Sequence, residues 1–357
     1  MLTILAFIFV LGLLVFVHEL GHFLIAKKAG IKVEKFSLGF PPKLVGRKIG
    51  DTEYCIGVVP LGGYVKMAGE NITEDTYTPK PGDFMAASTG KRFWVIVAGP
   101  VMNFLLGIFL FFIIYWASGM PQSRLDSTEV GIVTAGAPAA QAGLKTGSKI
   151  ISIDGNHFRN FNEIAAYIRQ RPDELIKIEW LDGEKLMAET IRTLSVPFTD
   201  SLGNVRREGR IGIGPTFTYS PIGPLTALKE ATLFSFELTG QMLTIVFRLI
   251  TRQESVKSLG GPVMIAQQAG AAAKQGLSSL LGLAAFLSIN LAILNILPIP
   301  VLDGGHLVFL GIEALKRRPI SVKGRLIAQQ VGMGLLFILM AVVTYNDIVR
   351  LVTGIIR

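Results

Sequence analysis

Residues 1–28 read MLTILAFIFVLGLLVFVHELGHFLIAKK, an apolar stretch that holds two histidines and a glutamate. Residues 1–17 carry no charged side chain, and the stretch suits the ~20 residues that a membrane-spanning helix needs. A secretory signal peptide is the alternative, but Lys27 and Lys28 follow the apolar residues instead of preceding them, and no small-residue cleavage site closes the stretch. We therefore interpret residues 1–26 as a retained transmembrane helix that carries His18, Glu19 and His22 within the bilayer.

The composition of the whole chain also indicates a membrane protein. Of its 357 residues, 50% are hydrophobic and 17% are charged, whereas soluble domains have roughly 25% charged residues. Uncharged runs near spanning length occur at residues 1–17, 93–117, 277–301 and 326–345. We predict a polytopic α-helical membrane protein with four transmembrane helices, at residues 1–26, 92–118, 277–315 and 326–350.

Basic residues set the expected orientation of these helices. The net charge is +9, and clusters of Lys and Arg occur at residues 27–48 and 316–325, beside two of the predicted helices. Both clusters belong in the cytoplasm by the positive-inside rule, so we expect the N-terminus and residues 118–276 on the outer side. Because the bases flank helices, they give no reason to expect a nucleic-acid partner. The single cysteine, Cys55, allows no intramolecular disulfide.

Three segments lie between the predicted spans. Residues 27–91 alternate apolar with polar side chains at 32–38, 53–58 and 62–67, which predicts a cytoplasmic, membrane-associated β-rich region. Residues 119–220 indicate an extracytoplasmic α+β domain, with its core at about 129–194 and a tail. Residues 221–276 are apolar but carry Lys229, Glu230, Glu237 and Arg248, so we expect interfacial amphipathic helices, or helices packed on the bundle, rather than a fifth span.

The core of the extracytoplasmic segment resembles a PDZ domain of the type found with proteases. A strand at 130–134 precedes Ala139-Ala140-Gln141-Ala142-Gly143-Leu144, a second strand, a helix at 161–171 and a hairpin around Asp182-Gly183. Thr146 and Ser148 stand where the PDZ pattern more often has Pro and Asp. Another small α+β fold is the alternative. Such a domain could exclude bulky substrates or capture a newly exposed C-terminus, and the sequence leaves both roles open.

His18, Glu19 and His22 form a recognised chemical pattern. A spacing of four residues puts both imidazoles on one helix face, about one turn apart, where they can share a metal. In this H-E-x-x-H arrangement the glutamate is not a ligand and acts instead as the general base. The pattern alone is weak, but buried charges at membrane depth are rarely without function. A polar cluster that merely holds helices together is the alternative.

A catalytic zinc site needs a third protein ligand. Within membrane depth, the other carboxylate that stands well inside an apolar stretch is Asp303, in NILPIPVLDGGH at residues 295–306. Pro298 and Pro300 cannot sit in an unbroken helix, so the backbone should unwind there and present Asp303 to the metal. His306 is the alternative ligand, or it packs near the site beyond the break.

Three separated motifs resemble the site-2 protease family: His18 to His22, Ala98-Gly99-Pro100-Val101-Met102-Asn103, and residues 295–304. The likeness extends over nearly the whole chain, and the bacterial regulator-of-sigma-E proteases are similar, although many of those carry two PDZ domains and this chain has room for one. The resemblance implies an intramembrane zinc metalloprotease of the bacterial cell (inner) membrane.

The resemblance also implies roles for individual residues. It makes His18, His22 and Asp303 the ligands of one Zn2+ and Glu19 the general base. Asn295 would contact the substrate backbone, and Asn103 would either do so or pack between helices. Substrates would be transmembrane proteins, such as anti-sigma factors, or remnant signal peptides, cut after a first-cut protease has acted.

Hydrolysis within a membrane requires the substrate helix to unwind, because its backbone groups are otherwise bonded internally. Gly62, Gly63 and Tyr64, with the residues up to Met67, could bind the unwound chain as an added edge strand. An ordinary cytoplasmic strand is the alternative. A membrane adaptor and a metal transporter are the rival functions, and zinc content together with the activity of Glu19→Gln would separate all three.

Overall fold

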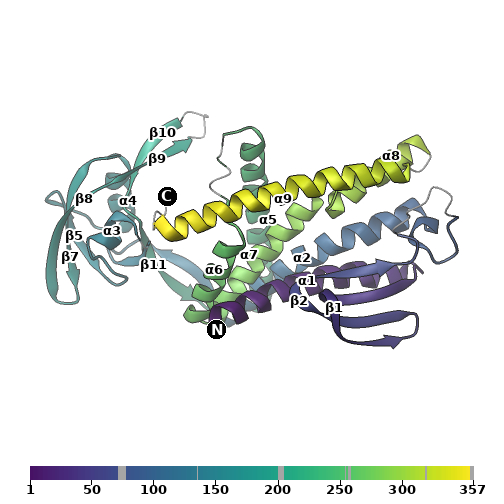
Figure 1. Cartoon of the computed structure of the whole chain (residues 1–357). Coiled ribbons are helices and arrows are strands. Elements are labelled where there is room, and N and C mark those ends of the chain that lie inside the picture. Colours follow the sequence, from purple (N-terminus) through teal and green to yellow (C-terminus); the bar gives the residue numbers. More distant parts are fainter. Residues whose placement is uncertain are drawn as a thin grey trace. The chain divides into compact units, whose positions relative to one another are not determined.

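The computed structural model describes residues 1–70, 78–134, 136–199, 205–253, 255, 259–317 and 320–353 (Figure 1). It divides into two compact units. The first comprises Met1–Ser118 and Ile222–Val349 and is mainly helical; the second consists chiefly of Gly119–Pro221 and is rich in strands. Each unit is described by itself.

The helices of the first unit are long and apolar, as transmembrane helices must be to satisfy their backbone groups internally. In chain order they are α1 (Leu2–Lys28), α2 (Thr89–Ser118), α5 (Pro224–Ile250), α6 (Pro262–Gln275), α7 (Leu277–Ile296), α8 (Asp303–Lys316) and α9 (Val322–Thr353), with a short 3-10 helix η1 (Phe84–Ala86) before α2.

Helices α1, α2 and α7 form the centre of this unit. Val10 and Leu14 of α1 pack with Leu110 and Phe111 of α2 and with Ile289 of α7. Glycines allow the helices to approach closely: a Cβ on Gly21 would lie 2.4 Å from the Ala98 carbonyl oxygen, and one on Gly107 would lie 2.5 Å from Ile289. This close contact sets the distance between the H-E-x-x-H helix and α2.

Among the residues that the structure describes, five helices are long and apolar enough to cross a membrane: α1, α2, α5, α7 and α9. The predicted count of four is therefore not confirmed, because α5 also meets the criterion although we expected interfacial helices in that region. The reason lies in the spacing of its charges, since Glu237 is the only charged residue between Glu230 and Arg248. Phe234 and Phe236 of α5 contact Phe111 and Phe104 of α2, so α5 packs on the bundle.

A twisted hairpin of β1 (Val33–Ile49) and β2 (Thr52–Met67) follows α1. Both strands bend, so that residues 33–38 pair with residues 53–56 on one side and with residues 63–67 on the other. In the described part of the chain, residues 63–67 pair only with residues 33–38, which makes them an edge of this small sheet. That edge runs beside α1 (Figure 1).

The chain unwinds between α7 and α8, where the prolines led us to expect a break. Helix α7 ends at Ile296 and α8 begins at Asp303, and short-range bonds such as Ile299 N–H to the Leu297 carbonyl join them. The fold-back is tight, because a Cβ on Gly304 would lie 2.1 Å from the Leu297 carbonyl oxygen. Asp303 thereby becomes the first residue of a new helix.

The described residues of the second unit form three sheets and two short helices. Its strands are β3 (Met120–Arg124), β4 (Val130–Val133), β5 (Lys149–Ile153), β6 (Asn156–His157), β7 (Leu175–Asp182), β8 (Lys185–Arg192), β9 (Leu194–Thr199), β10 (Val205–Arg210) and β11 (Ile213–Ser220), and its helices are α3 (Pro138–Gln141) and α4 (Phe161–Arg169).

The strand orders are β6-β5-β7-β8, β3-β11-β4 and β10-β9. Buried Trp180, Ile153, Ile164 and Ile178 form the core of this unit. Strand β4 and helix α4 lie within the ranges expected from the sequence, and β7 and β8 flank the expected hairpin at Asp182-Gly183, whereas β3, β9, β10 and β11 were not anticipated.

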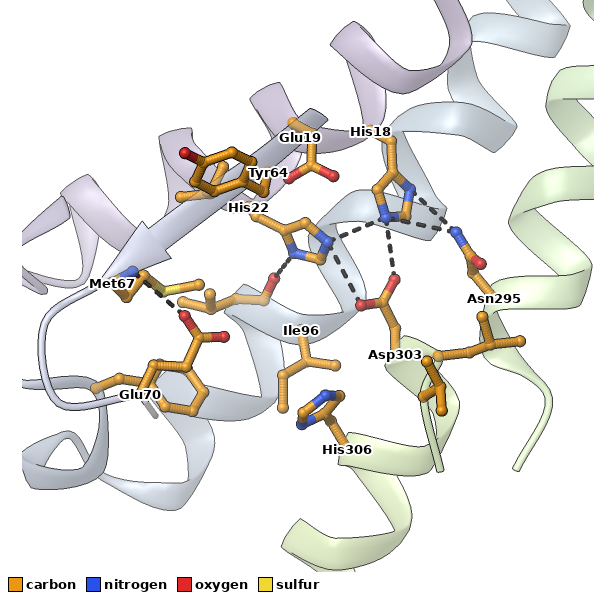
Figure 2. A pocket seen from close by; sticks show the side chains of 15 residues that line it. His18, Glu19, His22, Tyr64, Met67, Glu70, Ile96, Asn295, Asp303 and His306 are labelled. Carbon is orange, nitrogen blue, oxygen red and sulfur yellow. Dashed lines mark hydrogen bonds and ion pairs between the residues drawn. The ribbon is translucent and has the colours of Figure 1, made fainter. Parts of the chain in front are cut away.

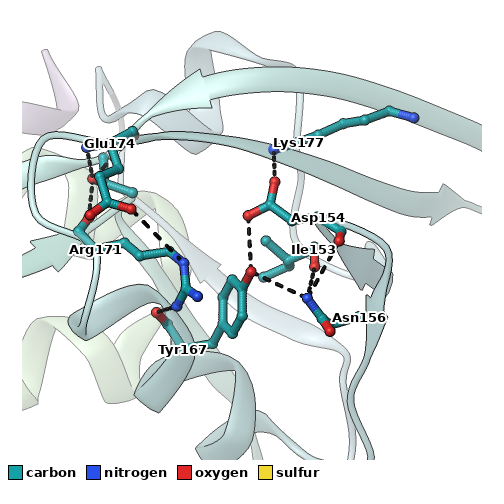
Figure 3. A network of polar contacts seen from close by, with 8 residues as sticks. Ile153, Asp154, Asn156, Tyr167, Arg171, Glu174 and Lys177 are labelled. Atoms are coloured by element: carbon teal, nitrogen blue, oxygen red, sulfur yellow. Dashed lines mark hydrogen bonds and ion pairs between the residues drawn. The ribbon is translucent and has the colours of Figure 1, made fainter.

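Polar contacts fix α4 against the larger sheet of this unit. The Tyr167 hydroxyl donates to the Asp154 carboxylate at 3.1 Å, and the same carboxylate accepts from the Lys177 backbone N–H at 2.8 Å (Figure 3). The Arg171 guanidinium lies over the Tyr167 ring, 3.4 Å from its centroid. At the helix start, the Asn160 side chain accepts from the Glu163 N–H as an N-cap.

Candidate active site

The candidate site is a cavity of about 260 Å³ between α1, β2, α2 and the break that leads into α8 (Figure 2). Polar side chains from separate elements line it: His18, Glu19 and His22 from α1, Tyr64 from β2, Asn295 from α7, and Asp303 and His306 from α8. The residues are distant in sequence, so the fold brings them together.

The two histidines point toward one another from a single face of α1. Their Nε2 atoms are 3.2 Å apart, and both side chains are buried (Figure 2). His22 Nδ1 lies 2.7 Å from the Val95 carbonyl oxygen, a contact that requires the proton on Nδ1. This leaves the His22 Nε2 lone pair directed into the site. Two facing lone pairs repel, so the arrangement favours a cation between them.

Asp303 completes a three-ligand arrangement. Its Oδ2 lies 3.2 Å from His18 Nε2, and its Oδ1 lies 3.5 Å from His22 Nε2. Zinc bonds of about 2.0–2.2 Å in tetrahedral geometry place ligand atoms roughly 3.3–3.6 Å apart, close to these separations. Asp303 Oδ2 is also buried without a hydrogen-bond donor. The three side chains therefore fit a zinc ion that leaves a fourth position for water or substrate.

Among the residues that the structure describes, these three are the one group of His, Cys, Asp or Glu side chains with ligand atoms close enough to hold a metal. His306, the alternative ligand, lines the same cavity but is not part of that group. Its ring contacts Phe309 within α8.

Asn103 and Asn295 both approach the His18 ring. The Asn103 amide nitrogen is 3.3 Å from His18 Nδ1, and its Oδ1 is buried without a partner. An Asn amide can present either its nitrogen or its oxygen to a neighbouring ring. If His18 Nε2 faces the metal, Nδ1 carries a proton, so the reversed Asn103 amide would accept it and leave no orphaned oxygen. Asn103 is fully buried and does not line the cavity, whereas Asn295 does.

Glu19 stands between the histidine pair and strand β2. Its carboxylate interacts with the backbone of Val65, and its Cγ would lie 3.4 Å from a Cβ on Gly63. Tyr64 and Val65 line the cavity with it. Gly62 instead faces the Phe40 ring, which a Cβ would approach to 2.2 Å. The edge strand thus runs past the candidate base, and Tyr64 and Val65 contribute directly to the cavity wall.

Gly99 has a role at the site that the sequence did not suggest. A Cβ at this position of α2 would lie 2.3 Å from His22 Nε2 and 2.7 Å from His18 Cε1. Any side chain here would enter the space that the two histidines share. The motif Ala98 to Asn103 therefore contributes at least two features, an absent side chain at Gly99 and an amide beside His18.

Glu70 was also not predicted, although it lines the cavity from the turn after β2. Its Oε2 accepts from the Met67 N–H at 3.2 Å. Burial raises the pKa of the Glu70 carboxyl above its ordinary value, and the hydrogen bond from Met67 opposes this increase. A glutamate three residues beyond an expected edge strand was the available signal, but only the fold shows that it turns toward the site.

Two further carboxylates connect the helices around the site. Glu313 of α8 is buried and pairs with Arg92 of α2 at 2.9 Å and with Arg325 of α9 at 3.1 Å. Asp347 of α9 is 4% exposed and accepts from the backbone N–H groups of Gly261 and Met264 at the start of α6. Glu313 and Asp347 are thus buried acidic residues outside the candidate metal group, and both bind cationic or N–H partners.

The whole chain was compared with known proteins. A model of peptidase family M50 matches residues 6–339, which include every residue of the candidate site. The chain belongs to peptidase family M50. This M50 peptidase is 36% identical to the Mesorhizobium japonicum protein mll0638, a provisionally named zinc metalloprotease, over 97% of its own length and 98% of that protein.

Relatives with more specific names agree with this assignment. The M50 peptidase is 31% identical to the regulator of sigma-W protease RasP of Bacillus subtilis, over 98% of its length and 99% of the relative. Part of the chain is also 29% identical to the PDZ domain of an SdrC-like protein from Listeria monocytogenes, covering 26% of this chain and 90% of that one with a TM-score of 0.20. Family membership and the named relatives establish an intramembrane zinc metalloprotease of the site-2 type.

Proposed function

We propose that this peptidase hydrolyses a peptide bond within transmembrane segments of other membrane proteins, with one zinc per chain held by His18, His22 and Asp303. The convergence of the three ligand atoms at 3.2–3.5 Å carries the proposal. When bound, the zinc would supply a Lewis acid for the scissile carbonyl and activate the attacking water.

The side chains around the metal divide the remaining work. Glu19 takes the proton from the attacking water and returns it to the leaving nitrogen, which is general base and general acid catalysis by one group. The Val95 carbonyl holds the His22 ring through Nδ1, and Asn103, with its amide oxygen turned toward His18 Nδ1, would hold the His18 ring. Asn295 lines the cavity beside His18, where its amide can donate to the substrate backbone.

The substrate would bind as an unwound strand along β2. Residues 63–67 are an edge of the described sheet and lie beside Glu19, so their outward backbone groups can pair with an extended peptide. Pairing also replaces the internal hydrogen bonds that the substrate helix loses on unwinding. Gly63 and Tyr64 belong to this segment and Gly62 directly precedes it, and Tyr64 reaches the cavity itself.

The inserted unit is proposed to be an extracytoplasmic PDZ domain, on the basis of the motif at residues 137–144 and the order of its elements around α4. The two clusters of bases support an outer N-terminus and a cytoplasmic β1–β2 hairpin. If α5 also spans the membrane, the residues C-terminal to it lie on the opposite side, and α9 has the opposite orientation. The relationship to RasP, a regulator of sigma-W, supports substrates such as anti-sigma factors or signal-peptide remnants that a first protease has already shortened.

Glu19→Gln tests the proposal. The variant should bind zinc and retain its substrate uncut, because the ligands remain and only the base is lost. Glu34→Gln is the matched control, since Glu34 pairs with Lys66 on the surface of the hairpin. Zinc analysis and cleavage of a reconstituted transmembrane substrate are the measurements. Full cleavage by Glu19→Gln would remove Glu19 from the role of base. Absence of cleavage by the wild type would favour an adaptor function, and zinc uptake into vesicles would favour a transporter.

A further inference from the structure

The active-site cavity extends past the metal ligands to a second polar group, Glu70. This residue and Met67 line the wall at the end of β2, and Glu70 Oε2 accepts from the Met67 N–H (Figure 2). Its other oxygen, Oε1, receives no hydrogen bond from any residue that the structure describes. Within the described part of the chain, Glu70 thus uses Oε2 to bond the turn, and its carboxylate lines the cavity.

A partly buried carboxylate with an unoccupied oxygen needs a donor. Water can serve while the cavity is open, but a substrate strand laid along β2 would displace it. Val65 lies beside Glu19 and Met67 is two positions further along, which is roughly 7 Å in an extended strand. A substrate side chain about two residues from the scissile bond would therefore meet Glu70.

The charge of the substrate suggests which side chain this is. Transmembrane segments carry Lys and Arg at their cytoplasmic ends. Glu70 follows the β1–β2 hairpin, within the region that the basic residues assign to the cytoplasmic side. A Lys or Arg side chain brings donors only, which complements a carboxylate oxygen that accepts only. Long basic side chains also extend toward the aqueous phase, here the cytoplasm, and therefore toward the hairpin.

We propose that Glu70 forms a subsite for a basic side chain of the substrate, near the cytoplasmic end of its transmembrane segment, and so sets which bond reaches the metal. This inference rests on the proposed function. It makes Glu70 a specificity residue: the carboxylate contacts the substrate but takes no part in the chemistry.

The competing role for Glu70 is structural, because its bond to Met67 could simply hold the turn after β2. Glu70→Gln separates the two roles. The amide oxygen can still accept from Met67, while the NH2 group replaces the free oxygen and repels a cationic donor. A structural role would leave the choice between substrates unchanged, whereas a specificity role would alter it.

The experiment uses the full chain, zinc-loaded and reconstituted, with one transmembrane substrate in two forms that differ by Lys or Met at a single flanking position. Lys is scanned through the three positions on each side of the scissile bond. We expect wild type to favour Lys at one position in kcat/KM by on the order of tenfold, and Glu70→Gln to lose that preference, so that its kcat/KM ratio between the Lys and Met forms falls to about one. Glu34→Gln, which removes a carboxylate outside the cavity, should retain the preference.

Several results would overturn the inference. Equal loss on both substrates would assign Glu70 to the turn alone, and equal preference for Lys, Asn and Ser over Met would reject a site for cations. A wild-type enzyme that cleaves the Met form without any position at which Lys is favoured would also reject it. If the zinc-loaded wild type cleaves neither form, the proposed function itself fails.

Discussion

Replacing Gly99 by alanine should disable the site while leaving the fold largely intact. The added Cβ would lie 2.3 Å from His22 Nε2, whereas ordinary contact begins at 3.4 Å, so the shortfall is 3.4 − 2.3 = 1.1 Å. His22 cannot yield freely, because its Nδ1 is bonded to the Val95 carbonyl at 2.7 Å. Either the ring leaves its position or α2 moves away from α1.

The size of the effect follows from this displacement. A shift of about 1 Å at a reacting centre costs about 100-fold in rate, and disturbance of a ligand's supporting bond costs about 10- to 100-fold in metal affinity. Stability should change much less, because overpacking costs about 1–3 kcal/mol. The better helix propensity of alanine returns roughly 0.5–1 kcal/mol of that.

Gly90→Ala is the matched control. Gly90 stands in the same helix, and a Cβ there would meet nothing within 4 Å. We expect Gly99→Ala to fall about 100-fold in cleavage of a reconstituted substrate and to bind zinc more weakly, with its thermal unfolding close to that of wild type, while Gly90→Ala behaves as wild type in all three measurements. Stoichiometric zinc together with near-normal cleavage in Gly99→Ala would refute the geometry inferred for His22.

Three further predictions concern the ligand, a helix contact and the orientation. Asp303→Ala should reduce bound zinc well below one per chain in metal analysis, and a variant that keeps zinc and activity would remove Asp303 from the ligand set. Asp347→Ala should lower stability by about 0.5–2 kcal/mol, because the start of α6 loses its acceptor, and an unchanged thermal transition would contradict this. A cysteine at Glu184, in a Cys55→Ser background, should react with a membrane-impermeant reagent added outside, and labelling only after permeabilisation would reverse the orientation. Glu184 suits this labelling because its side chain is exposed, whereas a position such as Ser148 in the same unit is buried.

Local patterns in the sequence predicted much of the candidate site. The four-residue spacing of His18 and His22 determines a shared helix face whatever surrounds it, and Pro298 and Pro300 exclude a continuous helix. These signals act within a few residues, so a single sequence reveals them. The same reasoning located the edge strand near residue 64, because alternation and glycines are also local features.

Contacts between distant segments could not be read in this way. Nothing near Gly99 in sequence indicates that His22 lies against it, and Asp347 finds its partners only because α9 passes the start of α6. The strand pairing of the inserted unit could not be predicted locally either, because β11 pairs with both β3 and β4, which are distant from it in sequence. Helix α5 has the length and hydropathy of a span although it carries Lys229, Glu230, Glu237 and Arg248, because these charges lie mostly toward its ends.

The prolines and glycines around the break before Asp303 act together to place this carboxylate. The prolines end α7 at Ile296 and release its last carbonyls, and α8 must then restart within a few residues to keep Asp303 near the histidines. Gly304 and Gly305 make that restart possible, because a Cβ on either would lie within 2.3 Å of a carbonyl oxygen from the linking segment. Asp303 at the first helical position also gains from the helix dipole while it faces two imidazoles. Alanine at Gly305 should therefore move Asp303 and lower zinc affinity although no ligand is changed, and retention of full zinc affinity by Gly305→Ala would contradict this account.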